Sequence, residues 1–336
     1  MNRIKQLLPR VNRYFKTNLH THCTISDGRM PLEEVKERYK ANGYQVLCMT
    51  DHNVIADHSD LNESDFLMLT GIEVNFNAPN YGEAYSKTYH LNLISKDPTN
   101  KWSPRELSIK RRPTAEPYEA LMQWEDMGIT CDPESINTMI AKANSKGFLV
   151  MYNHPTWSCH EYPDYAPLKG LWGMELRNTE CCMIGHNENN FRVFKDLLNC
   201  GSRLFPVGTD DAHFPRAVGG SWIMVGAETL RYDSVIQALE KGDFYMSCGP
   251  EITDLFVEDG VLHITCSDAQ RVNLESYGRY AKVVIAEDEP LRSARFPLES
   301  FFEMVNGDPN AFLYLTVTAA DGSYATTRAY FLNELV

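Results

Sequence analysis

Seven short apolar runs, rich in β-branched residues, alternate with helical segments over the first 250 residues of the chain. The runs are Phe15–Leu19, Val46–Met49, Phe66–Leu69, Tyr89–Ile94, Phe148–Tyr152, Gly173–Leu176 and Leu204–Val207. Helix signals lie between them: Pro31 and Gly43 flank Leu32–Asn42, Asp132-Pro133 and Gly147 flank Glu134–Lys146, and Asp233 and Gly242 bracket a third segment. Strands that alternate with helices predict parallel βα units, and seven such units approach a closed barrel.

The pattern changes after Pro250. Runs with a period of two residues follow, at Val261–Cys266, Lys282–Ala286, Phe312–Thr318 and Tyr324–Phe331. Asp259-Gly260 and Asp321-Gly322 are typical of tight hairpin turns between such strands. We therefore expect a barrel over residues 1–250 and a small antiparallel, β-sandwich-like domain over residues 251–336. The stretch Asn77–Arg112, rich in Pro, Asn, Lys and Arg, is expected to be a long loop or insertion beside the barrel mouth.

The charge balance limits the partners of this chain. There are 32 Lys plus Arg against 45 Asp plus Glu, a net charge of −13, and 43% of the residues are hydrophobic. This composition is that of a folded globular protein. An acidic protein repels polyphosphate backbones at long range, so we expect neither long nucleic acid nor a membrane as a partner. A small anionic phosphorylated substrate is still compatible with this net charge if positive charge at the binding site outweighs the repulsion from the rest of the protein.

The sequence also indicates a cellular compartment. No window reaches eighteen consecutive apolar residues, and residues 1–15 lack the apolar core of a signal peptide. The nine cysteines are odd in number and never form Cys-x-x-Cys, which is typical of reduced thiols. These features predict a cytoplasmic protein. The oligomeric state is left open.

Side chains that can bind metal ions follow nearly every predicted strand. They are His20, His22 and Asp27, then Asp51-His52, then Glu73, then Asn153-His154, and then Asp210, Asp211 and His213. Alternation along an extended chain points His20 and His22 to the same side. Imidazole and carboxylate ligands without cysteine fit Zn, Mn or Fe. Each motif is weak alone, but six of the ten histidines (20, 22, 52, 90, 154 and 213) share this face, which favours a metal site.

Five motifs occur in a fixed order along the chain. They are His20-Thr21-His22 with Ser26-Asp27-Gly28, Thr50-Asp51-His52, Gly71-Ile72-Glu73, Asn153-His154-Pro155 and Gly208-Thr209-Asp210-Asp211-Ala212-His213. Together they resemble the motifs of the PHP (polymerase and histidinol phosphatase) metallohydrolases, over about residues 14–250. The resemblance implies a distorted (β/α)7 barrel, so the fold class expected is α/β. It also implies a trinuclear metal site with up to three divalent ions.

The resemblance implies a ligand set for each ion. His20, His22, Glu73 and Asp211 would hold the first ion, Glu73, His90 and His154 the second, and Asp27, His52 and His213 the third. Two positions depart from the family pattern. His90 lies at the start of its apolar run instead of beyond the end, and the last motif has two aspartates. Asp211 is aligned with the ligand because it keeps the two-residue spacing to His213.

Charge arithmetic favours a phosphate ester as the substrate. Three divalent ions carry +6, three carboxylates −3 and a bridging hydroxide −1, which leaves +2 for a phosphomonoester dianion. We therefore expect a metal-dependent phosphoesterase that hydrolyses a small phosphorylated metabolite or nucleotide by attack of metal-bound hydroxide. One alternative is an amide, ester or carbamate hydrolase, because the C-terminal β domain resembles that of carbamate hydrolases in this family. Another is a non-catalytic, metal-containing binding protein.

Residues outside the ligand set complete the candidate site. Arg177, after the sixth run, and Arg216, three residues past His213, are candidates to bind a phosphate oxygen. Asp210 is a candidate proton donor to the leaving group, or a buried partner of a ligand histidine. Asp51 is expected to orient neighbouring residues instead of binding metal. Lys110-Arg111-Arg112 is expected either to attract a second phosphate or to be a solvated charge run.

Overall fold

All seven apolar runs form strands in the computed structural model, which describes residues 4–11, 13–104 and 113–335. They are β2 (Tyr14–Asn18), β3 (Val46–Met49), β4 (Leu67–Asn77), β5 (Thr88–Ser95), β8 (Phe148–Tyr152), β9 (Gly173–Asn178) and β10 (Phe205–Thr209). Every residue of β3 and β8 is buried, as expected of strands covered on both faces. The three helices that the sequence predicts also form: α1 (Leu32–Ala41), α3 (Pro133–Ser145) and α7 (Tyr232–Lys241).

These seven strands lie side by side in one sheet, in the order β10-β9-β8-β5-β4-β3-β2. The pairs β2–β3, β3–β4, β8–β9 and β9–β10 are parallel. In contrast, β5 is antiparallel to both β4 and β8, so the prediction of uniformly parallel βα units is wrong at this strand. The reason is the connection from β4 to β5, residues 78–87, which is too short for a crossover helix and reverses the chain.

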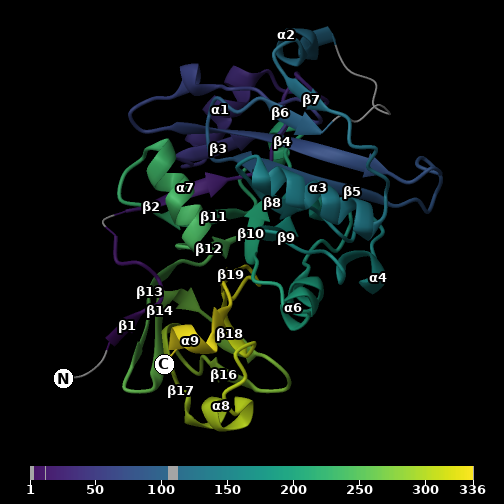
Figure 1. Cartoon of the computed structure of the whole chain (residues 1–336). Helices are drawn as coiled ribbons and strands as arrows, with labels where there is room; N and C mark the ends of the chain where they lie inside the picture. Colours follow the sequence, from purple (N-terminus) through teal and green to yellow (C-terminus); the bar gives the residue numbers. More distant parts are fainter. Residues whose placement is uncertain (1–3, 12, 105–112, 336) are drawn as a thin grey trace.

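The first and last strands of this series approach each other at one end. Thr21 and Ala212 form an isolated parallel bridge, the N–H of His22 donates to the Ala212 carbonyl at 3.2 Å, and that of Asp211 donates to the His20 carbonyl at 2.9 Å. These bonds join the segments that follow β2 and β10. A closed barrel stays a prediction, whereas a large mixed sheet with helices outside it is observed (Figure 1).

Residues 77–104 do not form a long loop, and the prediction is corrected for this described part of the segment. It contains the end of β4, all of β5, and β6 (Trp102–Pro104), which pairs in parallel with β7 (Gln123–Glu125). The residues that suggested a loop lie partly in the β4–β5 turn and partly after β5. Lys110, Arg111 and Arg112 lie outside the described residues.

The C-terminal part is antiparallel, as predicted. Its strands are β13 (Ile252–Glu258), β14 (Val261–Ala269), β15 (Arg271–Ser276), β16 (Ala281–Ile285), β17 (Leu291–Pro297), β18 (Phe312–Thr318), β19 (Tyr324–Thr327) and β20 (Tyr330–Phe331). Two further antiparallel strands, β11 (Trp222–Gly226) and β12 (Phe244–Ser247), precede residue 250. Asp259 and Gly260 both have positive φ, 47° and 79°, in the β13–β14 hairpin, which is the geometry of a type I′ turn. The Asp321-Gly322 turn connects β18 to β19.

Two features cross the boundary predicted at residue 250, which itself stays a prediction. The large sheet continues through β2-β11-β12-β19-β18-β15-β16, so C-terminal strands extend the sheet of the first part. In addition, β1 (Ile4–Gln6) pairs with β13 in a separate four-stranded sheet, β1-β13-β14-β17. A second buried core, which includes Leu262, Leu274 and Leu315, draws on both sheets, an arrangement like a sandwich (lower half of Figure 1).

The remaining helices are short. They are α2 (Glu116–Glu119), α4 (Tyr162–Tyr165), α5 (Thr179–Met183), α6 (Phe191–Asn199), α8 (Glu299–Val305), α9 (Leu332–Leu335) and the 3-10 turns η1 (Ser59–Leu61), η2 (Pro113–Ala115) and η3 (Pro215–Ala217). Across residues 4–11, 13–104 and 113–335, no helix combines the length and the apolar character needed to cross a bilayer.

Candidate metal centre

The nine predicted ligands gather at one edge of the large sheet, although they come from six strands. His20, His22 and Asp27 follow β2, His52 follows β3, Glu73 lies in β4, His90 in β5, His154 after β8, and Asp211 and His213 after β10. Seven of them line a cavity of about 390 Å³: Asp27, His52, Glu73, His90, His154, Asp211 and His213. The site is therefore an open pocket whose floor is polar.

Four of the nine predicted ligands, His20, His22, Glu73 and Asp211, form an inner group. The Nε2 atoms of His20 and His22 lie 3.2 Å apart, and each is 3.3 Å from Glu73 Oε2. Asp211 Oδ1 lies 3.1 Å from His20 Nε2 and 3.0 Å from His22 Nε2. All four side chains are at most 8% exposed. This inner group is the set that the resemblance implies for the first ion.

The two carboxylate oxygens of Glu73 face different histidines. Oε2 faces the inner group and also lies 3.1 Å from His52 Nδ1. Oε1 lies 3.0 Å from His90 Nδ1 and 3.3 Å from His154 Nε2. Glu73 thus stands between the inner group and a His90–His154 pair, as a carboxylate that bridges two ions must.

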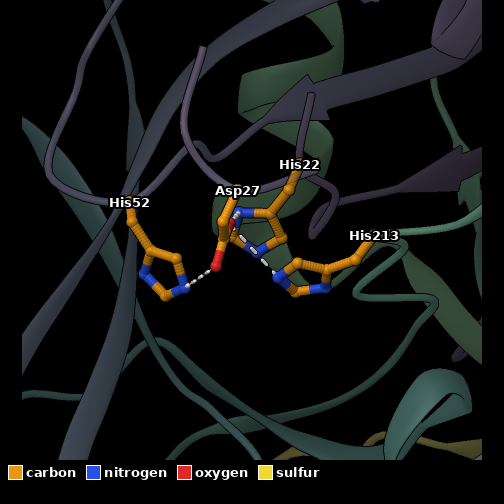
Figure 2. Close-up of side chains that lie close together, drawn as sticks. All are labelled: His22, Asp27, His52 and His213. Atoms are coloured by element: carbon orange, nitrogen blue, oxygen red, sulfur yellow. Dashed lines mark ion pairs between the residues drawn. The ribbon is translucent and has the colours of Figure 1, made fainter. Parts of the chain in front are cut away.

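Asp27, His22, His52 and His213 form an outer group, which Figure 2 shows. Asp27 Oδ1 lies 3.3 Å from His213 Nε2 and 3.7 Å from His22 Nδ1, and Oδ2 lies 3.7 Å from His52 Nε2. The Asp27 side chain is 46% exposed. The outer group therefore lies at the mouth of the cavity, where an incoming molecule meets it first.

Buried partners orient the ligands. Glu175 Oε1, from β9, lies 2.6 Å from His20 Nδ1, so this nitrogen carries the proton and Nε2 presents its lone pair to the inner group. Asn178 Nδ2 donates to Glu175 Oε2 and to Asp211 Oδ2, both at 3.0 Å. The sequence analysis missed Glu175, whose signal was a carboxylate inside an apolar strand run.

Asp51 has the orienting role expected of it. Its Oδ1 accepts hydrogen bonds from the N–H groups of Cys23 and Ser26 and from the Ser26 hydroxyl. This carboxylate thus holds the turn that carries Asp27. Gly28 completes that turn, because a Cβ at this position would lie 2.6 Å from the carbonyl carbon and oxygen of His22.

Two ligand residues adopt a strained backbone. His154 has φ 22° and Asp211 has φ 51°, in the left-handed region that residues with a Cβ rarely occupy. Such conformations persist where surrounding contacts impose them, and they are concentrated at functional sites. The bonds of Glu175 to the His154 N–H and of His20 to the Asp211 N–H supply those contacts.

The spacing of the inner group fits a divalent cation. Two ligand atoms that each lie about 2.1 Å from one ion are roughly 3.0–3.4 Å apart, which is the range observed among the four atoms. Three buried atoms in this region, His52 Nδ1, His90 Nε2 and Asp211 Oδ1, have no hydrogen-bond partner with acceptable geometry. Buried polar atoms are rarely left so unless another species binds them. The residues present therefore fit metal ions.

The carboxylates dominate the electrostatics of the pocket. Burial and the charge of His213 oppose protonation of His22, yet Asp211 and Glu73 raise its pKa to about 9. Burial likewise opposes protonation of His213, but Asp27 and Glu180 raise its pKa to about 12. For His52 burial prevails and lowers the pKa to about 3. A negative field that holds protons on buried imidazoles attracts divalent cations equally well.

Asp210 does not face the cavity, so its predicted role as a proton donor to the leaving group is corrected. The residue is fully buried. Its carboxylate accepts hydrogen bonds from the N–H groups of Gly219, Gly220 and Ser221 and from the Tyr44 hydroxyl. Burial raises the pKa of Asp210, and the three N–H groups oppose that rise. Asp210 therefore fixes the loop after η3.

The predicted arginines are displaced from the ligands. Arg177 is half-buried and donates to Asn189 Oδ1 at 2.8 Å, and neither it nor Arg216 lines the cavity. Arg216 is exposed, with its guanidinium carbon 5.5 Å from the centre of the Phe214 ring. Both were expected to touch phosphate because of their positions after apolar runs, but Arg177 lies within β9 and Arg216 lies in η3.

The cavity wall includes residues that the sequence analysis did not select. Arg29, Glu180 and Phe214 line it, and Trp157 packs edge-on against His90 and His154 with ring centres 5.3 and 4.9 Å apart. Glu180 accepts a hydrogen bond from the His213 N–H at 2.7 Å. No sequence signal marks Arg29, Glu180 or Phe214, although Arg29 and Phe214 each lie within two residues of a ligand. The histidines at 58, 160, 186 and 263 do not line this cavity.

A comparison with known protein families finds a match for the segment that carries most of these ligands. Residues 17–102 match the PHP domain family. The matched segment contains His20, His22, Asp27, His52, Glu73 and His90, so the resemblance seen in the motifs is confirmed. No curated protein is similar enough to the chain to count as a match.

Three solved structures are similar to this chain. A two-domain protein of Bacteroides vulgatus that contains a predicted PHP-like metal-dependent phosphoesterase has 15% identity and a TM-score of 0.45, with 98% of each chain covered. A protein of Bifidobacterium adolescentis, provisionally assigned as a metal-dependent phosphoesterase, has 16% identity and a TM-score of 0.38, covering 62% of this chain and 90% of that chain. PsfC from Pseudomonas syringae has 12% identity and a TM-score of 0.39, covering 67% and 87%. These scores are too low to transfer residues or activity.

Proposed function

We propose that this protein is a metal-dependent phosphoesterase that acts on small phosphorylated molecules. The observation that carries the proposal is the inner group, in which two imidazole nitrogens lie 3.2 Å apart and each lies 3.0–3.3 Å from both of two carboxylate oxygens. Without a cation such a concentration of buried carboxylates is unfavourable. The PHP match to residues 17–102 supports the same conclusion.

Three clusters of ligand atoms would hold the ions. They are His20, His22, Glu73 and Asp211; His52, Glu73 and His90, with His154 beside them; and His22, Asp27, His52 and His213. Zn, Mn and Fe all suit imidazole and carboxylate ligands. Bound there, divalent ions would supply Lewis acidity, which polarises a phosphoryl oxygen and makes a coordinated water acidic enough to act near neutral pH.

The net charge of the ligand set favours a phosphate ester over a carboxyl ester. Three divalent ions would bring +6 against −3 from Asp27, Glu73 and Asp211, so the set would carry about +3 with neutral histidines. A phosphomonoester dianion would compensate most of that charge. A neutral ester or carbamate would not, and two ions already suffice for its chemistry.

The protein's own residues position the reaction. Glu175 keeps His20 Nε2 available, and Asn153 Nδ2 donates to Glu73 Oε1 at 2.8 Å, which fixes the orientation of that carboxylate. Trp157 and Phe214 restrict the cavity beside the ligands and reduce the access of bulk water. The exposed Asp27 edge faces solvent, so the ester enters from the outer group.

A panel of chromogenic substrates tests the proposal. The metal-loaded protein is assayed with p-nitrophenyl phosphate, bis-p-nitrophenyl phosphate, p-nitrophenyl acetate and an aryl carbamate. We expect hydrolysis of at least one phosphate ester, abolished in His22→Ala. His263→Ala is a matched histidine control, because His263 stacks on Phe256 in the C-terminal sheet, away from the cavity. Hydrolysis of only the acetate or carbamate would reassign the protein to the carboxyl-ester class, and no hydrolysis would favour a binding protein.

A further inference from the structure

Two arginines approach the same aromatic ring at the mouth of the cavity. The guanidinium carbon of Arg29 lies 4.7 Å from the centre of the Phe214 ring, and that of Arg216 lies 5.5 Å from it. Arg29 and Phe214 line the same cavity as the metal ligands. Both guanidiniums therefore lie against one ring, and that ring lines the cavity beside the outer group.

Neither guanidinium has an acidic partner among the residues that the structure describes. Some other surface arginines form ion pairs: Arg10 with Asp254, Arg38 with Glu34 and Arg192 with Asp196, each at 2.8 Å. Asp27 lies only two residues from Arg29, but its carboxylate faces three histidines instead. Within the described ranges, no carboxylate thus forms an ion pair with either of these two arginines.

The backbone fixes this pair next to the outer group. The Arg29 N–H donates to the His213 carbonyl at 2.9 Å, and Arg29 follows Gly28, whose turn packs against His22. Phe214 directly follows His213, and Arg216 is two residues further on in η3. The position of both arginines therefore depends on the same segments that carry Asp27 and His213.

We infer that Arg29 and Arg216 form a subsite for a second anionic group of the substrate. This group is a phosphate or a carboxylate carried by the leaving group. This inference rests on the proposed function. Divalent ions held by the ligand groups would supply the positive charge for the reacting phosphoryl group, whereas Arg29 lines the cavity outside the ligand set. A guanidinium binds phosphate or carboxylate through two parallel N–H bonds, which suits recognition of a group that does not react. The cavity volume of about 390 Å³ is within the range of small-molecule sites and exceeds a single phosphoryl group.

Binding of non-hydrolysable anions tests the subsite directly. Calorimetric titration of the metal-loaded protein compares methylphosphonate with phosphonoacetate and with diphosphonates whose spacers have one, two or three methylenes. We expect at least one two-anion probe to bind about tenfold or more tightly than methylphosphonate, the gain expected of one charge-assisted contact. The affinity for phosphonoacetate, compared with the affinities for the diphosphonates, shows whether the second group is a carboxylate or a phosphate.

Three variants assign the effect to residues. Arg29→Gln should remove most of the preference for the two-anion probe, and Arg216→Gln should reduce it. Arg13→Gln is the matched control, because Arg13 is also exposed and stacks on a phenylalanine, Phe15 at 5.5 Å, but does not line the cavity. It should leave the preference intact.

Two results would overturn the inference. One is a wild type that binds every two-anion probe no better than methylphosphonate. The other is an Arg29→Gln protein that loses affinity for methylphosphonate and the two-anion probes by the same factor, which would place Arg29 on the reacting group. Wild-type turnover of phosphate esters is a separate readout: a preference for two-anion probes that needs Arg29, without any phosphatase activity, would disprove the proposed function and retain the subsite.

Discussion

Replacing Asp210 by Asn separates a structural role from a catalytic one. The Asp210 carboxylate accepts hydrogen bonds on both oxygens, from Gly220 and Ser221 on Oδ1 and from Gly219 and Tyr44 on Oδ2. An asparagine keeps one acceptor oxygen and turns an NH2 group toward the other two donors. Tyr44 can redirect its hydroxyl to the Ser221 carbonyl at 3.3 Å, but the Gly219 N–H is left without an acceptor.

The expected cost follows from these contacts. A buried donor without a partner costs about 1–3 kcal/mol, and two bonds to a neutral amide are each weaker by roughly 1 kcal/mol than bonds to a carboxylate. Removal of the buried charge offsets part of this, so Asp210→Asn should lower the free energy of unfolding by about 2–4 kcal/mol. With an unfolding entropy of about 2.1 cal/mol/K per residue, the 336 residues give about 0.7 kcal/mol/K, or a fall in Tm of roughly 3–6 °C.

The assay combines differential scanning calorimetry with metal analysis and turnover at a temperature well below both transitions. Metal content should stay at the wild-type level, and turnover should stay within about threefold of wild type, because Asp210 points away from the cavity. Asp211→Asn is the matched comparison, since it changes the adjacent carboxylate that belongs to the inner group, and it should lose metal and activity. An Asp210→Asn protein with unchanged Tm and turnover reduced more than 100-fold would refute this reasoning and restore the proton-donor role.

Three further perturbations test other parts of the account. Asp27→Ala removes the only carboxylate of the outer group, so it should release mainly one metal equivalent. Phosphomonoester turnover should fall by about 10²-fold or more, and carboxyl-ester turnover should change less. Full phosphatase activity with one metal lost would contradict this. Glu175→Gln takes the charged partner from His20 Nδ1 and should weaken metal affinity about 10- to 100-fold in a chelator competition, with an unchanged far-UV circular dichroism spectrum; unaltered affinity would show that Glu175 does not orient the ligand. A chain that ends at Pro250 should aggregate, because Phe312, Tyr314 and Phe331 pack in the same buried core as the strands before residue 250, and β19 pairs with β12. A soluble, metal-loaded product would show that the boundary at 250 separates two independent domains.

The strands and ligands could be predicted because they follow local patterns. Apolar runs of four to six residues identify buried strands, and a ligand just past a strand end has a defined place if the strands are parallel. His90 shows the limit of that rule. It seemed misplaced at the start of its run, yet β5 runs antiparallel to β4, so its beginning lies at the edge where β4 ends, and His90 Nδ1 is 3.0 Å from Glu73.

The rest of the site depends on contacts distant in sequence. Glu175 meets His20 across 155 residues, and the role of Asp210 depends on the loop at Gly219–Ser221, whose direction no local pattern reports. Arg177 and Arg216 were chosen from position alone. Arg29 is the arginine that lines the cavity, because its N–H bond to the His213 carbonyl holds that segment against the outer group.

Metal content tests the central claim most directly. Protein purified without chelator is analysed for transition metals per chain, and metal-free protein is titrated with Mn²⁺ or Zn²⁺ under the same conditions. The arrangement of the inner group, the His90–His154 pair and the outer group predicts two to three bound equivalents, with the inner site the last to be emptied by chelator because its four side chains are buried. A protein that holds no metal on purification and takes up no more than one equivalent on titration would contradict the account.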